Sequence, residues 1–494
     1  MTDLDYLKMG RLEKLIYKLK SKLSKIGQAP SIILNFFRQL ILLVVKAAKC
    51  VYAELSDIVL TYVHGDWKTR VSYTVMGFGS IARGQIFRGL LFFLFQTVFN
   101  LYIVFFGGAY LAKFGTLGTV ATTKVNRKTV YGDNSFMILL YGILTIFFII
   151  AFIYTWRANV RQNKISQEIL KSGKKLKYAK DDIASLADNQ FHKTLLALPT
   201  LGIFAFTVLP IVFMILVAFT NYDATHQPPG KLFTWVGFDN FKTLFSSGSA
   251  NYGDAFGQVL LWTLIWAFFA TFLNYFLGML VAIMINKKGI RFKKMWRTIL
   301  VMTIAIPQFV SLLYVSKLFA ADGLINSLLL EWGWIKEALP FWTKPNWARV
   351  TVIAVNIWIG IPYLMLIATG ILMNIPADLY ESARIDGANA VQIYGKITLP
   401  YMLFVTGPYL LTSFIGNINN FNVIYLLTQG KPDTLGNSAG TTDLLITWLY
   451  SLTVDNSNFK IAACIGIIVF IVCAVINLVV YNMIPSVKNE EDFQ

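Results

Sequence analysis

The sequence is poor in charged residues and in cysteine. Asp, Glu, Lys and Arg make up only 14% of its 494 residues, whereas 56% are hydrophobic and the mean hydropathy is +0.58. Soluble domains carry about 25% charged residues, so this composition excludes that class and predicts a chain that resides in a bilayer. The three cysteines, Cys50, Cys464 and Cys473, lie in apolar stretches and offer neither a disulfide framework nor a metal-ligand spacing.

Signatures of catalysis are also missing. The chain has no GxxxxGK[ST] phosphate-binding stretch, which predicts that it does not hydrolyse ATP itself. Its histidines, His64, His192 and His226, are scattered without a carboxylate partner at a recognisable spacing. The adjacent acids Asp181 and Asp182 lie in a Lys-rich loop, so a solvated helix start explains them better than the acidic cluster of a membrane glycosyltransferase. We expect a chain that is not an enzyme and holds no cofactor or metal.

Several apolar segments are long enough to cross a membrane. A hydrocarbon core about 30 Å thick requires roughly 20 helical residues at about 1.5 Å each. The candidate spans are 86–111, 136–156, 194–219, 256–286, 298–320, 349–374, 401–428 and 459–484. The sequence therefore predicts an all-α polytopic membrane protein with about eight transmembrane helices.

Basic residues gather on one side of these spans. The formal net charge is +18, and most Lys and Arg fall in the N-terminal arm, in the loops 157–193 and 287–297, and in other segments of the same side. By the positive-inside rule this side is the cytoplasm, so both chain ends are expected there. Topology and anionic lipid explain the positive charge better than nucleic acid, which is not expected as a partner.

The first 84 residues precede the spans and divide into two parts. Residues 1–30 form a Lys-rich arm without the apolar core and cleavage site of a signal peptide, so the arm should stay cytoplasmic. Residues 31–63 are more apolar, but Arg38, Lys46 and Lys49 gather within roughly a quarter turn at 100° per residue. This pattern predicts an amphipathic helix that lies in the membrane interface.

The loop 376–400 carries the most specific motif. It is polar although it lies between two spans, so it is expected at a membrane face. Asp378 suits a helix N-cap or first turn, and Gly387 supplies the permissive backbone where a first short helix ends. Two short helices joined by a turn are predicted, and Pro400 is expected to mark the start of the next membrane helix.

This loop resembles the EAA loop of binding-protein-dependent ABC importer permeases. The matching positions are Glu381, Ser382, Ala383, Gly387, Ile397, Leu399 and Pro400. Only Ser382 departs from the family pattern, which usually has Ala. The resemblance implies that the loop docks on a cytoplasmic ATPase subunit, which uses ATP and Mg and whose closure moves the membrane helices. The alternative is an ordinary interhelical loop.

Amides are concentrated in the span predicted at 401–428. Four of them should lie near mid-membrane: Asn417, Asn419, Asn420 and Asn422. Amides are costly in lipid, so they must face other helices or a wet cavity. They donate and accept hydrogen bonds, as sugar hydroxyls require, and Phe421 or Tyr425 could offer an aromatic face to a sugar ring. The alternative is that the amides only join helices.

The stretch 417–445 resembles the larger permease subunit of maltose/maltodextrin importers, whose seventh span lines the sugar site. The sugar-contacting positions that this implies are Asn419, Asn420, Phe421 and Tyr425, with Gly416 and Asn422 as weaker candidates, and Thr447 and Tyr450 as residues that face the path. Lys431 replaces a Gly that is common in the family. The loop 220–255 is too short for the large extracytoplasmic domain of Gram-negative members, which points to a Gram-positive type of system.

The resemblance also implies an architecture and partners. A type I ABC importer permease core is expected in residues 194–488, after two spans and a basic loop in 85–193. The expected partners are a second, related permease subunit, two ATPase subunits and a lipid-anchored extracytoplasmic binding protein for the oligosaccharide. A permease for other oligosaccharides or several sugars is an alternative, as is an ion-coupled secondary transporter. The latter should place acids in mid-membrane, and the spans hold almost none.

Overall fold

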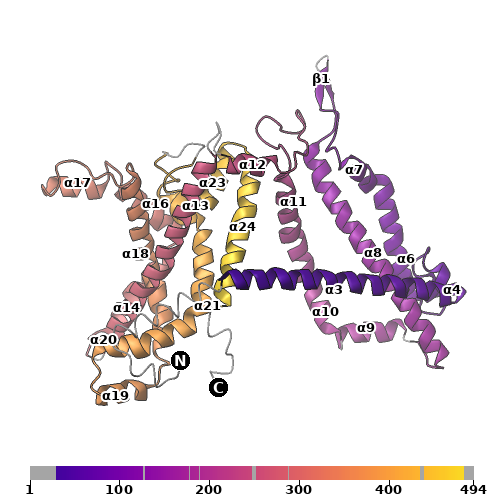
Figure 1. Ribbon diagram of the computed structural model, residues 1–494, viewed down its shortest axis with the longest axis horizontal. Helices are drawn as coiled ribbons and strands as arrows, with labels where there is room; N and C mark the ends of the chain where they lie inside the picture. Colours follow the sequence, from indigo (N-terminus) through magenta and orange to yellow (C-terminus); the bar gives the residue numbers. More distant parts are fainter. Residues whose placement is uncertain are drawn as a thin grey trace. The chain divides into compact units, whose positions relative to one another are not determined.

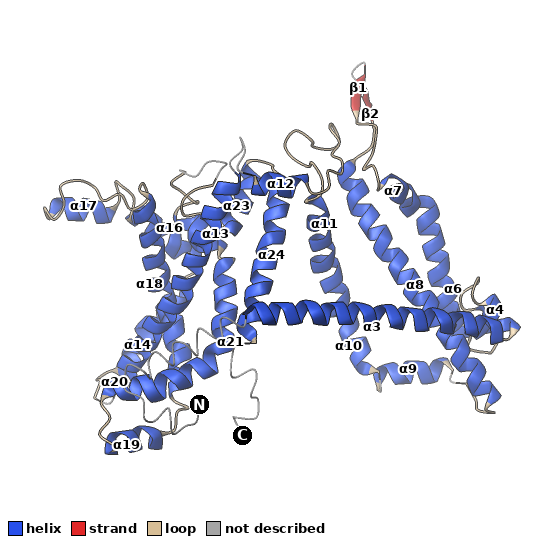
Figure 2. Ribbon diagram, in the orientation of Figure 1, coloured by secondary structure: helices blue, strands red, loops and turns tan. Residues whose placement is uncertain are grey.

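A computed structural model describes residues 29–125, 128–176, 178–188, 190–246, 252–287, 289–433 and 439–482. The predicted Lys-rich arm therefore lies outside the described residues up to residue 28, as does the C-terminal tail after residue 482. Helices dominate the described chain, and its two strands form a short antiparallel hairpin of β1 (Thr123–Val125) and β2 (Lys128–Val130) (Figure 2). The prediction of an all-α polytopic membrane protein is confirmed.

The chain divides into two compact units. The N-terminal unit holds residues 36–240 and 458–463, and the C-terminal unit holds the remaining described residues. Up to residue 217 the helices are α3 (Ala29–His64), α4 (Trp67–Val71), α5 (Phe78–Ile81), α6 (Ile86–Tyr102), the π turn η1 (Ile103–Gly107), α7 (Gly108–Lys113), α8 (Ser135–Lys171), α9 (Ala179–Ala187), α10 (Phe191–Ile203), the π turn η2 (Phe204–Val208) and α11 (Leu209–Val217) (Figure 1).

The rest of the chain is helical as well. Its elements are α12 (Asp239–Phe245), α13 (Tyr252–Phe268), the π turn η3 (Phe269–Leu273), α14 (Asn274–Asn286), α15 (Lys293–Met302), the 3₁₀ turn η4 (Thr303–Ala305), α16 (Gln308–Leu318), α17 (Leu324–Glu331), α18 (Pro345–Leu372), α19 (Ala377–Ile385), α20 (Ala390–Ile393), the π turn η5 (Tyr394–Thr398), α21 (Leu399–Ile418), α22 (Phe421–Leu427), α23 (Leu445–Tyr450), the π turn η6 (Ser451–Asp455) and α24 (Phe459–Tyr481).

Seven continuous helices of the described chain are long and apolar enough to cross a membrane. They are Ile86–Lys113, Ser135–Lys171, Phe191–Val217, Tyr252–Asn286, Pro345–Leu372, Ala390–Ile418 and Phe459–Tyr481. The span predicted at 298–320 is instead a pair, Lys293–Ala305 and Gln308–Leu318, bent by 90°. Pro307 lies at the break and Ile306 before it is extended, as proline requires of its predecessor. Counting the pair as one crossing gives the predicted eight.

The span predicted at 401–428 is wrong at both ends. The helix starts at Ala390 and passes through Pro400, so Pro400 does not open it. A π turn, η5, ends two residues before Pro400, and η2 ends two residues before Pro210 in the same way. Proline leaves the carbonyl four residues earlier without its usual donor, and the wider turn absorbs this defect. At the other end the helix stops at Ile418, and α22 is a separate helix.

Two apolar clusters form the core of the C-terminal unit. The first joins α13, α16, α18 and α22 and contains Trp262, Trp266, Leu312, Val352, Val423, Ile424 and Leu427. The second joins α14, α18 and α21 and contains Tyr275, Met279, Leu364, Met365 and Met402. Gly278 lets α14 approach α18, because an added Cβ would lie only 2.6 Å from the Cβ of Leu364. Small residues commonly allow such close approach of membrane helices.

Candidate functional site

Two candidate sites lie at opposite ends of one helix in the C-terminal unit. The coupling loop, defined here as residues 376–389, precedes Ala390, and the amide site lies where the helix ends at Ile418. A helix of 29 residues spans about 43 Å at 1.5 Å per residue. One uninterrupted helix therefore joins the coupling loop to the amide site.

The coupling loop contains the first of the two predicted short helices, α19, whereas the second, α20, is the first turn of the long membrane helix and not a separate short helix. Pro376 occupies the N-cap position of α19, so Asp378 lies in the first turn and not at the N-cap. α20 begins with a capping box: the Asn389 side chain accepts from the Gln392 N–H at 2.9 Å, and the Gln392 side chain accepts from the Asn389 N–H at 2.8 Å. These reciprocal bonds satisfy two donors at the start of the long helix.

The backbone conformation at the end of α19 favours a glycine at position 387. Its φ is +73°, the left-handed region that favours glycine. The Gly387 N–H donates to the Arg384 carbonyl at 3.0 Å, and the Ala388 N–H donates to the Ala383 carbonyl at 2.9 Å. This is the Schellman pattern of helix termination. The predicted role of Gly387 in ending the first helix is confirmed, and its cause lies entirely within the loop.

Side chains of the coupling loop are largely exposed. Ile385 is 86% exposed and Leu379 is 47% exposed, and Val391, just after the loop, is 78% exposed. Apolar side chains presented by a polar loop suit a surface that another chain covers. One bond inside the chain, Tyr380 Oη to Thr398 Oγ1 at 3.2 Å, links α19 to the long helix.

The motif positions do not share one surface. Glu381, Ser382 and Ala383 lie on α19, and Gly387 caps it. Ile397, Leu399 and Pro400 instead belong to the continuing membrane helix, where Leu399 packs against the second core cluster. The first group can contact a partner directly, whereas the second connects the loop to the core.

The amide site lies at the break between α21 and α22. Asn420 is the N-cap of α22, and its Oδ1 accepts from the Val423 N–H at 3.3 Å. Its Nδ2 donates to Oδ1 of Asn417 at 3.3 Å. Asn417 donates in turn to Oγ1 of Thr271 at 3.0 Å, and its carbonyl accepts from the Trp266 indole at 3.1 Å. The two amides thus hold the break against α13 and η3.

The sugar-contacting positions predicted from the sequence omit Asn417, although it pairs with Asn420. Its spacing of three residues from Asn420, which puts both amides on one face of the predicted span 401–428, is the signal that could have identified it. Three other positions predicted to contact the sugar do not join this pair of amides. Asn419 is exposed and donates to the Ile415 carbonyl at 3.2 Å, and Asn422 and Gly416 are exposed as well.

Three predicted aromatic residues come together beside the amides. Phe421 and Tyr425 are stacked with ring centroids 4.7 Å apart, and the Tyr450 ring lies 4.9 Å from Phe421 and 5.1 Å from Tyr425. Tyr450 reaches them from α23, which is separated from α22 by a loop. Such a cluster offers apolar ring faces together with two hydroxyl groups.

Thr447 is engaged within the structure. It is only 3% exposed, and its hydroxyl donates to Oδ1 of Asp443 at 2.7 Å and accepts from the Leu444 N–H at 2.9 Å. The other carboxylate oxygen of Asp443 accepts from the Gly440 N–H at 2.8 Å. Burial raises the pKa of Asp443 to about 6. The main structural role of Thr447 is therefore to stabilise the start of α23.

A cavity of about 350 Å³ adjoins the aromatic cluster. Its lining residues are Tyr425, Gln429, Lys431, Asp433, Asp443, Thr447, Tyr450, Ser451, Asp455 and Asn456. The volume falls within the range of small-molecule sites. Three carboxyl groups face a single ammonium group, so the cavity is polar and carries a negative balance.

The chain is similar to known permeases of binding-protein-dependent transport systems. The family described as "Binding-protein-dependent transport system inner membrane component" matches residues 274–489. The maltodextrin transport system permease protein MdxF of Bacillus subtilis (strain 168) is 32% identical over 428 residues, covering 84% of this chain and 95% of that protein. The galactooligosaccharides transport system permease protein GanP of the same organism is 35% identical over 404 residues, covering 80% and 94%.

More distant similarities cover less of the chain. The maltose/maltodextrin transport system permease protein MalF of Escherichia coli (strain K12) is 34% identical over 267 residues, which cover 52% of this chain and 51% of that protein. A crystal structure of a bacterial alginate ABC transporter in complex with an alginate pentasaccharide-bound periplasmic protein matches 62% of this chain and 99% of its own, with 25% identity and a TM-score of 0.50. The family match, residues 274–489, includes both candidate sites.

Proposed function

Because this chain belongs to the family of binding-protein-dependent ABC importer permeases, and is a multi-pass permease subunit for oligosaccharides, we propose that it forms the pathway for maltodextrin-type sugars. One observation carries this proposal. The helix from Ala390 to Ile418 begins at the coupling loop and ends at the amide site, so a single element connects the energy-coupling surface with the substrate site.

The amides retain capacity for a ligand. A side-chain amide has two donor hydrogens and about two acceptor sites. Asn420 uses one of each within the chain, for Asn417 and the Val423 N–H. Asn417 also uses one of each, for Thr271 and Asn420. Each amide can therefore still donate one bond and accept one bond, which matches a pair of sugar hydroxyls.

The aromatic cluster and its cavity favour neutral sugars. The faces of Phe421 and Tyr425 can stack on the apolar face of a sugar ring. The carboxylates of Asp433 and Asp455 accept bonds from hydroxyl groups, but they repel a sugar that carries its own carboxylate. The relatives named for maltodextrin and galactooligosaccharides transport neutral substrates of this kind.

The exposed coupling loop is the proposed link between ATP hydrolysis and movement of the membrane helices. We propose that α19 docks on one of two ATPase subunits, that a second, related permease completes the pathway, and that a lipid-anchored binding protein delivers the sugar. Both chain ends then lie in the cytoplasm, in agreement with the basic loops. ATP binding closes the ATPases and moves the helix Ala390–Ile418, so that the amide site opens outward. Hydrolysis returns it to the inward-facing state.

A second substrate class has a specific observation in its favour. The relative named for galactooligosaccharides is 35% identical over 80% of this chain, and that identity exceeds the 32% of the maltodextrin relative. Both sugars are neutral and rich in hydroxyl groups. The amide site by itself does not distinguish a glucosyl from a galactosyl unit.

The test is uptake in cells that lack this chain. Labelled maltodextrins of several lengths, galactooligosaccharides and an unrelated monosaccharide are supplied with and without depletion of ATP. We expect selective, ATP-dependent loss of maltodextrin uptake. Loss of galactooligosaccharide uptake alone would retain the importer and change its substrate. Uptake that follows the proton gradient instead of ATP would overturn the proposal.

A further inference from the structure

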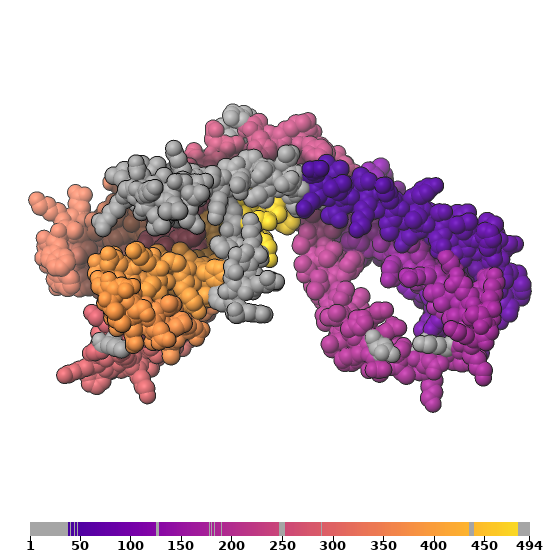
Figure 3. All heavy atoms as spheres, turned by 60° about the horizontal axis from the view of Figure 1, so that its bottom comes forward, coloured from indigo at the N-terminus to yellow at the C-terminus, as the bar shows by residue number. Residues whose placement is uncertain are grey.

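The polar residues of α3 lie on one side of this 36-residue helix. At 100° per residue, all of its charged positions fall within an arc of about 160°. These positions are Arg38, Lys46, Lys49, Glu54 and Asp57. The opposite side carries an apolar stripe that is well exposed, comprising Ile41 (63%), Val51 (53%), Leu55 (57%), Val59 (60%) and Tyr62 (49%). In Figure 3, α3 lies at the surface of the N-terminal unit.

The acidic part of the arc is attached to α8. Asp57 forms an ion pair with Lys164 at 2.5 Å, and Glu54 pairs with Arg157. Arg157 follows directly after the apolar part of α8, which ends at Trp156, and Lys164 lies about two turns further along. α8 has 37 residues and extends about 55 Å, so its last turns stand outside a hydrocarbon core of about 30 Å. The ion pairs therefore hold α3 at the level of the membrane surface.

A groove of about 680 Å³ lies between the two helices. Its charged lining residues are Glu54, Asp57, Arg157, Arg161, Lys164 and Glu168. Three cations balance three anions, and two of the pairs join α3 to α8 directly. Because the charges of the groove balance and pair across the two helices, the groove holds α3 against α8 and is not a site for an anion.

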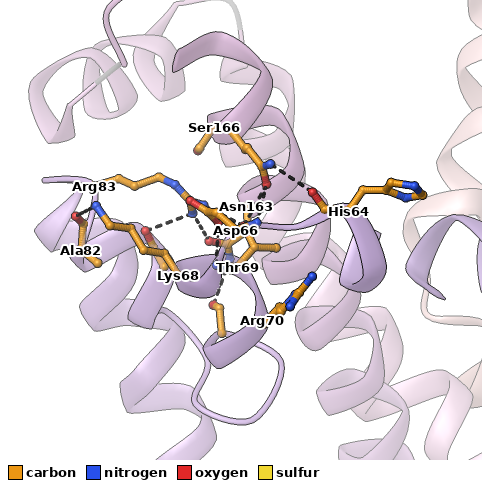
Figure 4. Close-up of polar contacts among 12 residues, drawn as sticks. His64, Asp66, Lys68, Thr69, Arg70, Ala82, Arg83, Asn163 and Ser166 are labelled. Atoms are coloured by element: carbon orange, nitrogen blue, oxygen red, sulfur yellow. Dashed lines mark hydrogen bonds and ion pairs between the residues drawn. The ribbon is translucent and has the colours of Figure 1, made fainter. Parts of the chain in front are cut away.

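A partly buried polar network anchors the segment directly after α3 (Figure 4). Asp66 caps α4, accepting from the Thr69 N–H at 2.9 Å, and forms an ion pair with Arg83 at 2.5 Å. The Arg83 side chain is 1% exposed and also donates to Asn163 of α8 at 2.6 Å. Asp66 is 38% exposed, but its removal would leave the buried Arg83 charge without its acid, which is destabilising.

The segment that follows α3 also bonds to α3 itself. Arg70 donates to the Tyr62 carbonyl at 3.1 Å, and Tyr73 donates to the Ile58 carbonyl at 2.7 Å. These bonds restrict the rotation of α3 and set the direction of its apolar stripe.

The cationic part of the arc has no such attachment. Arg38, Lys46 and Lys49 are exposed, and within the described residues none of them is paired with an acid. They lie within about 80° of one another on the helix. Three cations beside an apolar stripe are complementary to an anionic lipid surface, where phosphates meet acyl chains.

We propose that α3 lies in the plane of the membrane and binds anionic phospholipid. The stripe from Ile41 to Tyr62 enters the boundary of the acyl chains, and Arg38, Lys46 and Lys49 contact headgroup phosphates. The leaflet is the inner one if the chain ends are cytoplasmic, as proposed above. Sugar import is not needed for this binding, so the two proposals fail independently.

Depth measurements test the in-plane position. In the full-length complex, reconstituted in vesicles with Cys50, Cys464 and Cys473 replaced by Ser, a fluorophore is attached at one new cysteine. Ile41→Cys and Val59→Cys are about 27 Å apart along the helix. We expect the same acyl-chain nitroxide lipid to quench both labels to the same extent. Quenching at two different depths would mean that α3 spans the membrane, and protection from both lipid and aqueous quenchers would mean that a protein covers it; either overturns the proposal.

A neighbouring position supplies the matched control. Ser56 is exposed and lies on the charged side, whereas Leu55 lies on the stripe. A label at Leu55→Cys should be quenched by the lipid nitroxide and shielded from iodide, and a label at Ser56→Cys should show the reverse. Equal quenching of the two labels by lipid contradicts a fixed stripe.

The charge requirement is tested with lipid composition. Lipid quenching of the Leu55→Cys label is followed as phosphatidylglycerol replaces zwitterionic lipid in the vesicles. We expect quenching to rise with anionic lipid and this rise to fall by at least half in Lys46→Gln/Lys49→Gln. The control variant Lys174→Gln/Lys175→Gln removes the same charge outside α3 and should keep the full rise. An unchanged rise in the first variant, or an equal loss in the control, overturns headgroup binding.

Discussion

The two ends of the helix Ala390–Ile418 are built by different means. At the coupling loop the backbone hydrogen bonds join residues that are at most five positions apart, a single side-chain bond from Tyr380 reaches the long helix, and most side chains are exposed. At the amide site Asn417 bonds to Thr271, 146 residues away, and the side chains are half-buried. The loop is thus a locally stable surface for a partner, whereas the amide site depends on the packing of the whole C-terminal unit. Substitutions at the first end should change coupling alone, and those at the second should change both binding and stability.

The largest expected effect is that of Gly387→Val. A β-branched residue adopts a φ of +73° only with strain of about 1–2 kcal/mol, which is on the order of tenfold in the population of the native loop. An added Cβ meets no atom within 4 Å, so the packing of the chain itself is unaffected. We expect normal expression but loss of sugar-stimulated ATP hydrolysis in the purified complex, and little uptake.

Gly387→Asn is the matched control, because asparagine tolerates the left-handed region better than other residues with a Cβ. It should keep most of the coupled activity. Retention of sugar-stimulated ATP turnover by Gly387→Val would show that the loop does not transmit the closure of the ATPases. Sugar-stimulated ATP hydrolysis of the two variants is measured in purified complexes at equal amounts of protein.

Asn420→Leu should have the second largest effect and should lower both sugar uptake and the stability of the complex. It removes the N-cap of α22, worth about 1 kcal/mol, and leaves Oδ1 of Asn417 without the donor that Asn420 supplies. Uptake should fall on the order of tenfold, and the melting temperature of the complex should fall as well. Asn420→Ser keeps a capping oxygen and should lower uptake with a smaller thermal shift. Unchanged uptake of several sugars by both variants would remove Asn420 from the site.

Asp443 should make the stability of the fold near the amide site depend on pH. Its folded pKa of about 6 is higher than the unfolded value of 3.8, so the folded state binds more protons between these values. Stability is therefore present at low pH and is lost as the pH rises through about 6. Between pH 5 and pH 7 the loss amounts to about 1 kcal/mol. Thermal unfolding of the complex should show this decrease, and Asp443→Asn should remove it. A decrease of equal size in the variant would assign it to other groups.

Ser382→Ala should have the smallest effect. Ser382 is exposed on α19, and alanine is the better helix former by about 0.5 kcal/mol. Uptake and sugar-stimulated ATP hydrolysis should stay within about twofold of the unaltered complex. A marked loss of either activity would show that the hydroxyl group itself contacts the ATPase, and that this departure from the family pattern has a function.

Sequence reasoning succeeded where the causes are local. The spans follow from runs of apolar residues, and the coupling loop follows from Gly387 and from polar residues between two spans. It was wrong at the ends of the span 401–428, because hydropathy does not register a π turn before Pro400 or a helix break stabilised by Asn420. The contacts of Glu381 and of the other exposed loop residues stay predictions until a partner is present.

The sequence by itself determined the membrane class, the number of crossings and the coupling loop, since composition and short-range backbone geometry are properties of neighbouring residues. Only the tertiary structure decided the candidate sugar site. It placed Asn417 against Thr271 and Trp266, brought Tyr450 to Phe421 and Tyr425, and engaged Thr447 with Asp443. Most of these partners lie 25 to 151 residues apart, and a hydrogen bond or ring contact depends on distances that only packing sets.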